Sequence, residues 1–225
     1  MALFDQHVNG AVVASGVMVS ALFASSLVGV SEAVSLLTIG IIGGVLPDLD
    51  SSNSKPVQIT FRIFSIFLPF IVILSFIKEL ALVYIFGIWI ASALILEYGV
   101  FKLFLKITRH RGLFHSIPMG VFMGLLLYNA LYLFTDTTKS VAFLSGFMLF
   151  YGYMVHLLLD EIVSLNALGM RVKKSFGTAM KLYDKNNLLG TGVLYLAIYT
   201  LFTVNPIHIN KLDVIYNSIL KMNLY

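Results

Sequence analysis

His110-Arg111-Gly112-Leu113-Phe114-His115-Ser116 is a short polar stretch that lies between two long apolar segments of the chain. Glycine interrupts regular helix, so we expect His110 on a loop or a frayed helix end and His115 in the first turn of the following helix. The two imidazoles can then lie close together in the folded protein. Imidazole is the commonest protein ligand for a transition metal, and the guanidinium of Arg111 suits phosphate or carboxylate. The stretch therefore predicts a break between two helices and a candidate metal site at that break.

The composition is that of a membrane protein. The 225 residues are 59% hydrophobic and 12% charged, with a mean hydropathy of +0.92. Such values are typical of a polytopic α-helical membrane protein. No extramembrane stretch is long enough to fold separately, so we predict one integral-membrane domain over residues 1–225. The absence of cysteine excludes disulfides, thiolate metal sites and cysteine nucleophiles.

Apolar segments long enough to cross a bilayer recur along the whole chain. They are residues 8–30, 33–46, 59–77, 80–101, 113–134, 141–163 and 188–204. The second is short and spans only if its glycines and Pro47 lie at the far interface; a re-entrant segment is the alternative. The tail, 205–225, is expected to form an interfacial amphipathic helix. We therefore predict an all-α fold with about seven transmembrane helices.

The basic residues fix the expected orientation. With seven crossings, the loops 47–62, 102–111 and 164–187 share one side and contain eleven of the 15 Lys and Arg residues, against four on the other side. The positive-inside rule places the first side in the cytoplasm. The first ten residues contain no Lys or Arg, unlike a cleavable signal peptide. We expect a multi-pass protein of the inner, cytoplasmic membrane, and no nucleic-acid partner.

Side chains that bind metals gather at helix ends on this cytoplasmic side. Four of the five histidines are predicted at the cytoplasmic ends of the helices. Ionisable residues at membrane depth are functional candidates. The candidate ligands are His7, Asp48, Asp50, His110, His115, His156 and Asp160.

The spacing of these residues suits ligation. His156 and Asp160 are four positions apart, so both lie on one helix face; a simple His–Asp hydrogen bond is the alternative. Asp48 and Asp50 point to the same side if the chain there is extended, and otherwise act as turn residues that cap a helix end. His7 begins the first span, where an interfacial polar anchor is the alternative.

Taken together, the motifs resemble those of a known family. His7, Leu46–Asp50, His110–Ser116 and His156–Asp160 are similar to the successive motifs of the YdjM-like bacterial and archaeal inner-membrane proteins described as LexA-regulated, membrane-bound, metal-dependent hydrolases. The resemblance covers about residues 1–165, and 166–225 is less characteristic. It implies a metal-dependent hydrolase, without a substrate and without regulation by DNA damage for this chain.

The leading hypothesis is hydrolysis at the cytoplasmic membrane surface. The ligand count exceeds what one tetrahedral ion needs and suits one or two ions, which would share a carboxylate. Mixed imidazole and carboxylate ligands favour Zn²⁺, with Mn²⁺ or Fe²⁺ as alternatives. A metal-activated water would attack, Arg111 would hold the negative group, and Glu161 or Asp50 would serve as general base or orient a ligand. Headgroup depth and nearby cations favour membrane lipids as partners and a lipid or lipid-linked phosphoester as substrate.

Two other classes compete with the hydrolase. A metal or proton transporter would carry polar residues through the bilayer, whereas here the outer halves of the spans are almost wholly apolar. A structural membrane protein whose metal staples helices together is the third class. We interpret Tyr153 as a packing or interfacial aromatic, with orientation of His156, one turn later, as the alternative. Ser116 is expected to begin a helix. The basic run 171–185 is interpreted as a topology determinant that also meets anionic headgroups.

Overall fold

The computed structural model describes residues 3–50, 62, 65–66, 69, 81–100, 112–164 and 180–204. Helices make up nearly all of this part of the chain, and no strand occurs in it beyond an isolated bridge. The elements, in chain order, are α1 (Phe4–Ala24), α2 (Val30–Gly43), the 3-10 helix η1 (Leu46–Asp50), α4 (Leu82–Leu94), the π-helix η2 (Ile95–Val100), α6 (Ile117–Phe134), α7 (Lys139–Ser164) and α8 (Leu188–Val204). The predicted all-α membrane fold is confirmed.

Five helical stretches within these ranges are long and apolar enough to cross a membrane. They are α1, Val30–Asp48, Leu82–Gly99, α6 and α7, and α8 is a shorter apolar helix. The stretch Val30–Asp48 has 19 residues, so the short predicted segment 33–46 extends to a spanning length. The predicted span 59–77 lies mostly outside the described residues and the tail 205–225 wholly outside them. The count of seven therefore stays a prediction.

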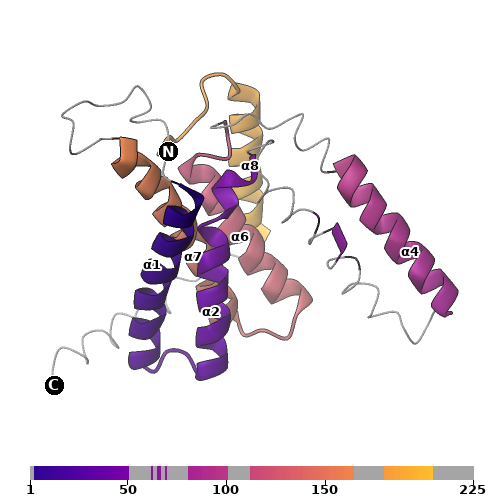
Figure 1. The fold of residues 1–225 in the computed structure, drawn as a ribbon, viewed down its shortest axis with the longest axis horizontal. Coiled ribbons are helices and arrows are strands. Elements are labelled where there is room, and N and C mark those ends of the chain that lie inside the picture. Colours follow the sequence, from indigo (N-terminus) through magenta and orange to yellow (C-terminus); the bar gives the residue numbers. More distant parts are fainter. Residues whose placement is uncertain are drawn as a thin grey trace. The chain divides into compact units, whose positions relative to one another are not determined.

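The chain forms two compact units, Met1–Pro47 with Leu113–Tyr225, and Asp48–Gly112. The prediction of one domain over 1–225 stays a prediction. In the first unit α7 contacts α1, α2 and α6, while α8 packs on α6 (Figure 1). Of the candidate spans, α7 is the most buried. It is the helix around which the first unit is assembled.

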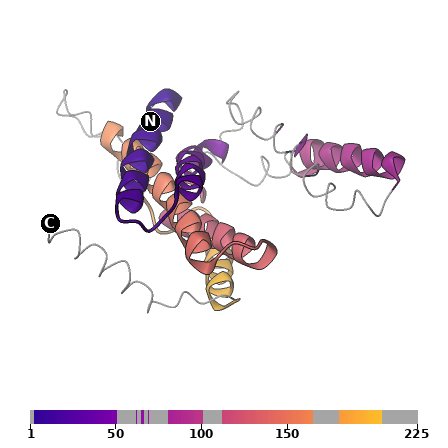
Figure 2. The same cartoon turned by 90° about the horizontal axis from the view of Figure 1, so that it is seen from below.

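Local chemistry sets the ends of these helices. Ser26, in the left-handed region at φ 57°, turns the chain between α1 and α2, which lie side by side (Figures 1 and 2). Ser116 caps α6 with its hydroxyl, and Pro118 occupies the first turn, where its missing N–H costs nothing. At the start of α8 the side chain of Asn187 accepts a hydrogen bond from Gly190 N at 2.9 Å.

Small residues allow α2 and α7 to approach until their backbones touch. A Cβ at Gly152 would strike the carbonyl oxygen of Gly40, and a Cβ at Gly43 would strike that of Leu149. Such contacts are how helices associate inside a membrane, where burial of apolar surface gives little driving force. The glycines thus fix the distance between two helices that carry parts of the site described next.

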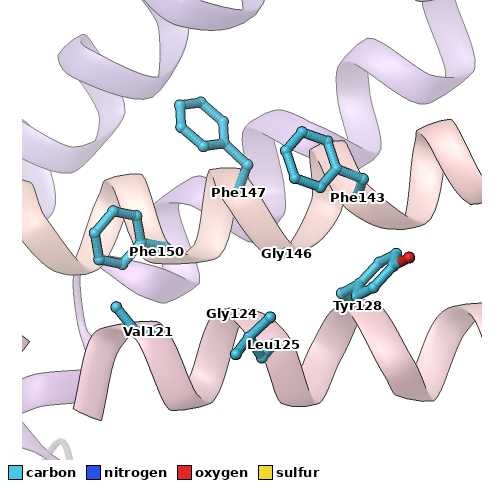
Figure 3. Close-up of a pocket in the computed structure, with 8 residues that line it drawn as sticks. All are labelled: Val121, Gly124, Leu125, Tyr128, Phe143, Gly146, Phe147 and Phe150. Atoms are coloured by element: carbon cyan, nitrogen blue, oxygen red, sulfur yellow. The ribbon is translucent and has the colours of Figure 1, made fainter. Parts of the chain in front are cut away.

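A second pair of glycines shapes an apolar pocket between α6 and α7. Gly124 and Gly146 face each other, and the pocket holds about 160 Å³ (Figure 3). Its other walls are apolar or aromatic side chains, drawn in Figure 3: Val121, Leu125, Tyr128, Phe143, Phe147 and Phe150. In a membrane such a pocket is surrounded by hydrocarbon.

The second unit contains α4 and η2. Arg62 Nε lies 3.0 Å from Glu97 Oε1, and Trp89 Nε1 donates a hydrogen bond of 2.9 Å to the carbonyl of Ile66. These contacts place the described residues of 62–69 alongside α4 and η2.

Candidate metal centre

Three segments far apart in the sequence bring four ionisable side chains to one end of the first unit. His7 lies in the first turns of α1, His115 just before α6, and His156 and Asp160 near the end of α7. All four are buried, with no more than 1% of any of them exposed. The structure thus brings together four of the seven predicted ligands.

The carboxylate of Asp160 lies between two histidines. His7 Nε2 is 3.3 Å from Asp160 Oδ1, and His115 Nε2 is 3.9 Å from Asp160 Oδ2. Each oxygen of the carboxylate therefore faces a different imidazole. This arrangement places Asp160 at the centre of the cluster.

His156 completes the cluster, and its ring is held by the backbone of α2. The rings of His7 and His156 are stacked, with centroids 3.6 Å apart and an interplanar angle of 10°. His156 Nδ1 lies 2.8 Å from the carbonyl oxygen of Gly44. A carbonyl only accepts, so Nδ1 carries the proton and Nε2 is left with the lone pair of a metal ligand.

These residues fit a divalent cation. Donor atoms of His7, His156 and Asp160 all lie within 4.8 Å of one another. Tetrahedral Zn²⁺ with bonds of about 2.0–2.1 Å holds its ligand atoms roughly 3.3 Å apart, which matches the 3.3 Å between His7 and Asp160. Within the described ranges, Nδ1 of the buried His7 has no hydrogen-bond partner, a costly condition for a buried polar atom. Nitrogen and oxygen donors of this kind suit a transition metal.

Two contacts position His115. The hydroxyl of Tyr153 donates a hydrogen bond to the carbonyl of Phe114, and Ser116 caps α6 on the other side. One expectation is corrected here. His115 is not in the first turn of a helix, because Ser116 and Pro118 delay the start of α6 to Ile117. The ring of Tyr153 is fully buried in an apolar cluster, as predicted for a packing aromatic.

The other predicted ligands, Asp48, Asp50 and His110, belong to the second unit. His110 and Arg111 lie outside the described residues, as does the side chain of Asp50. Asp48 is the first residue of the second unit. Leu46–Asp50 is a 3-10 helix, so the extended chain that the shared side of these aspartates required is not present.

Glu161 follows Asp160 on α7 and is half-buried. One residue further along an α-helix lies about 100° round its axis, so Glu161 projects from a different face. It is absent from the ligand groups found among the described residues. Its predicted role as base stays a prediction.

Two features of the site were missed from the sequence. The carbonyl of Gly44 orients His156, and the turn after Met180 pairs with the start of α6 through a bridge between Ser116 and Lys181. The role of a backbone carbonyl cannot be recognised from the residue type in the sequence. The turn falls in the run 171–185, whose basic character indicated topology alone.

Several apolar helices and a buried His/Asp cluster define the class: a polytopic membrane protein with a candidate metal centre. The family model of the YdjM inner membrane protein matches residues 10–173. The chain belongs to this family, which confirms the resemblance drawn from the motifs. The match begins just after His7. No curated protein and no solved structure matches the chain.

Proposed function

We propose that this protein is a membrane-embedded, metal-dependent hydrolase that cleaves a phosphoester of a lipid or lipid-linked substrate. The observation that carries the proposal is the burial of His7, His156 and Asp160 with their donor atoms within 4.8 Å. Ionisable side chains at membrane depth are expensive and mark functional sites. Here they converge from two helices on a geometry that suits one ion.

A small number of residues would bind the metal, hold the substrate and accept the proton. His7, His156 and Asp160 would hold the ion, and the second oxygen of Asp160, which faces His115, provides for a second ion that shares the carboxylate. Zn²⁺ is favoured by the donor types, with Mn²⁺ and Fe²⁺ as alternatives. When bound, a divalent ion supplies a Lewis acid and a water acidic enough to attack at neutral pH. Arg111 would hold the anionic group, and Glu161 or Asp50 would take the proton from the attacking water.

The apolar pocket supports a lipid substrate. Its walls lie six to thirteen residues from His115 along α6 and the same number from His156 along α7. At 1.5 Å per residue, both helices place the pocket about 9–20 Å from the cluster, near the middle of a hydrocarbon core of roughly 30 Å. A cavity of about 150 Å³ holds a molecule of six carbons, so this pocket is large enough for part of an acyl chain. A lipid with its phosphoester at the cluster would carry acyl carbons to that depth.

The site is proposed to face the cytoplasm, because the loops on its side contain most of the Lys and Arg residues. A substrate would then be drawn from the inner leaflet. The anionic headgroups of that leaflet match the basic surroundings.

The proposal is tested on purified protein in detergent, with phosphatidic acid in mixed micelles as the phosphoester. We expect one or two equivalents of a transition metal and release of phosphate in the wild type. Both are expected to be lost in His156→Ala and Asp160→Asn, and retained in the control His208→Ala, which alters the one histidine predicted on the other side. Metal content is read by elemental analysis, and each variant must be monodisperse.

Two outcomes would overturn the proposal. If the wild-type protein contains no metal after reconstitution with Zn²⁺ and Mn²⁺, the cluster is not a metal centre. If metal binds at the cluster but no lipid phosphoester is hydrolysed, the metal has a structural role and holds the helices together.

A further inference from the structure

We infer that the apolar pocket between α6 and α7 selects the substrate by the length of its acyl chains, and that Leu125 and Phe147 contact the chain that is selected. The inference rests on the proposed function and deepens it, since it names which lipids the same site would accept. A phospholipid with chains of ordinary membrane length should bind more tightly than the same headgroup on short chains.

The walls of the pocket run along the two helices. Each helix contributes one row of side chains, spaced by four and then three residues, which places each row along one helix face. The rows are Val121, Leu125 and Tyr128 on α6 and Phe143, Phe147 and Phe150 on α7 (Figure 3). Both helices are long and apolar enough to cross a membrane. Because spanning helices tilt only moderately from the membrane normal, the rows run in the direction that an acyl chain takes in a bilayer.

Backbone contact at the floor of the pocket keeps the pocket open. A Cβ at Gly124 would lie 2.8 Å from the carbonyl oxygen of Gly146, and a Cβ at Gly146 would lie 2.5 Å from that of Gly124. The two helices therefore cannot move closer to fill the space between the rows. At the end farthest from the His/Asp cluster, the rings of Tyr128 and Phe143 pack edge to face with their centroids 6.4 Å apart. A pocket that is formed before the ligand arrives lowers the cost of binding.

The position of the pocket along α6 and α7 relates it to chain length. The pocket begins six residues from His115 on α6 and six residues from His156 on α7, and it ends thirteen residues from each. At about 1.5 Å per residue these separations are roughly 9 and 20 Å. One leaflet provides half of a hydrocarbon core of roughly 30 Å, so a chain of ordinary length extends about 15 Å from the headgroup and a chain of half that length about 8 Å. Only the longer chain reaches the two rows.

The chain of a bound substrate has an advantage over the tails of surrounding lipids. A lipid whose phosphoester is held at the cluster presents its own chain to the pocket at a high effective concentration. The fixed aromatic side chains then give it dispersion contacts that mobile lipid tails do not give. The chain moves from hydrocarbon and not from water into the pocket, so packing alone provides the gain and the gain is moderate. The volume of about 160 Å³ accommodates about six carbons of the chain.

The test uses full-length, Zn²⁺-loaded protein, freed of lipid in detergent, with dipalmitoyl and dioctanoyl phosphatidic acid as ligands. Leu125→Trp fills the pocket from one row, and the control Leu126→Trp adds the same ring at a neighbouring residue that is 44% exposed. Native mass spectrometry gives the affinity for each lipid, and release of phosphate gives kcat/KM. We expect Leu125→Trp to bind the dipalmitoyl lipid about tenfold more weakly, as for about one methylene lost from an apolar pocket, and the dioctanoyl lipid within about twofold of the wild type. Leu126→Trp should match the wild type with both lipids.

A second variant, Phe147→Ala, removes a wall from the other row and should also weaken binding of the dipalmitoyl lipid alone, while its control Phe134→Ala alters a residue that is 84% exposed. Dipalmitoyl affinity that is unchanged in both pocket variants, an equal loss for both lipids, or a wild type that binds neither lipid overturns the inference. Hydrolysis of both lipids with equal kcat/KM in the wild type overturns it while the hydrolase stands. Binding that depends on chain length and on Leu125, in a wild type without hydrolysis, supports the inference, and the proposed function fails alone.

Discussion

Replacement of Gly152 by alanine tests whether the contact between α2 and α7 controls the metal centre. Gly152 lies one turn before His156, and its missing side chain leaves room for the backbone of α2. An added Cβ would strike the carbonyl oxygen of Gly40 and lie 2.9 Å from Gly44 N. Both are main-chain atoms, which cannot rotate away as a side chain would. The two helices must therefore separate.

The expected magnitude follows from overpacking. An extra methyl group in a tight interface costs about 1–3 kcal/mol. The same substitution at a helix position with open space gains roughly 0.5–1 kcal/mol, because alanine favours helix over glycine. Gly16 on α1 is such a position, since a Cβ there meets no atom within 4 Å. This gain applies at both helix positions and cancels in the comparison, so Gly152→Ala should be about 1–3 kcal/mol less stable than Gly16→Ala.

Metal affinity should fall together with stability. The carbonyl of Gly44 holds the ring of His156 through the bond of 2.8 Å, and this carbonyl moves with α2. Loss of a partner that orients a ligand typically weakens metal binding by about 10- to 100-fold. Gly16→Ala should bind metal as the wild type does.

The assay is thermal unfolding of detergent-solubilised protein followed by size-exclusion chromatography, with zinc affinity measured against a competing chelator. At roughly 2–4 °C per kcal/mol, Gly152→Ala should melt about 2–12 °C below Gly16→Ala. If the two variants melt within about 2 °C of each other and bind zinc equally, α2 and α7 are not in backbone contact at Gly152. The account of how His156 is held would then be refuted.

Three further predictions concern contacts elsewhere in the structure. Tyr153→Phe removes the donor to the Phe114 carbonyl and should weaken zinc binding about three- to tenfold with little change in zinc stoichiometry, since His115 loses a support but no ligand is removed. Asn129→Leu removes the hydrogen bond of 3.2 Å from Asn129 Nδ2 to the Leu201 carbonyl on α8 and should lower the melting temperature by about 1–6 °C, as expected for one interhelical bond of about 0.6–1.7 kcal/mol. Because the natural chain lacks cysteine, a single cysteine at Lys185 should react with an impermeant maleimide only from the cytoplasmic side, and one at Asp136 only from outside; the reverse pattern would place the site on the outer face.

The helices were predictable because apolar length is a strong signal in a membrane protein. The predicted segment 188–204 coincides with α8, and 141–163 differs from α7 by two residues at its start and one at its end. Larger errors occur at α1 and α6. The predicted segment 8–30 starts four residues after the start of α1 and continues six residues past its end at Ala24, through the turn before α2. The start of α6 at Ile117, four residues later than predicted, depends on Ser116 and Pro118. The conformation of the two aspartates after Pro47 was not predictable, because a single 3-10 turn has no periodic sequence pattern.

The site was predictable to the extent that topology alone determines it. Once helix directions are known, the starts of α1 and α6 and the end of α7 must share a level, which brings His7, His115, His156 and Asp160 together. What holds them cannot be predicted in the same way. The support from Gly44 depends on a helix separation set by glycines on two helices, and the position of Lys181 depends on a bridge between residues 65 positions apart.

The stacked pair of histidines bears on what the cluster binds. The two rings lie with their centroids 3.6 Å apart, and the bond to the carbonyl of Gly44 leaves His156 with a lone pair on Nε2. A simple His–Asp pair joins two of these side chains, whereas a divalent cation accepts a lone pair from each of His7, His156 and Asp160. It is this convergence of three donors within 4.8 Å that favours a metal over a His–Asp pair.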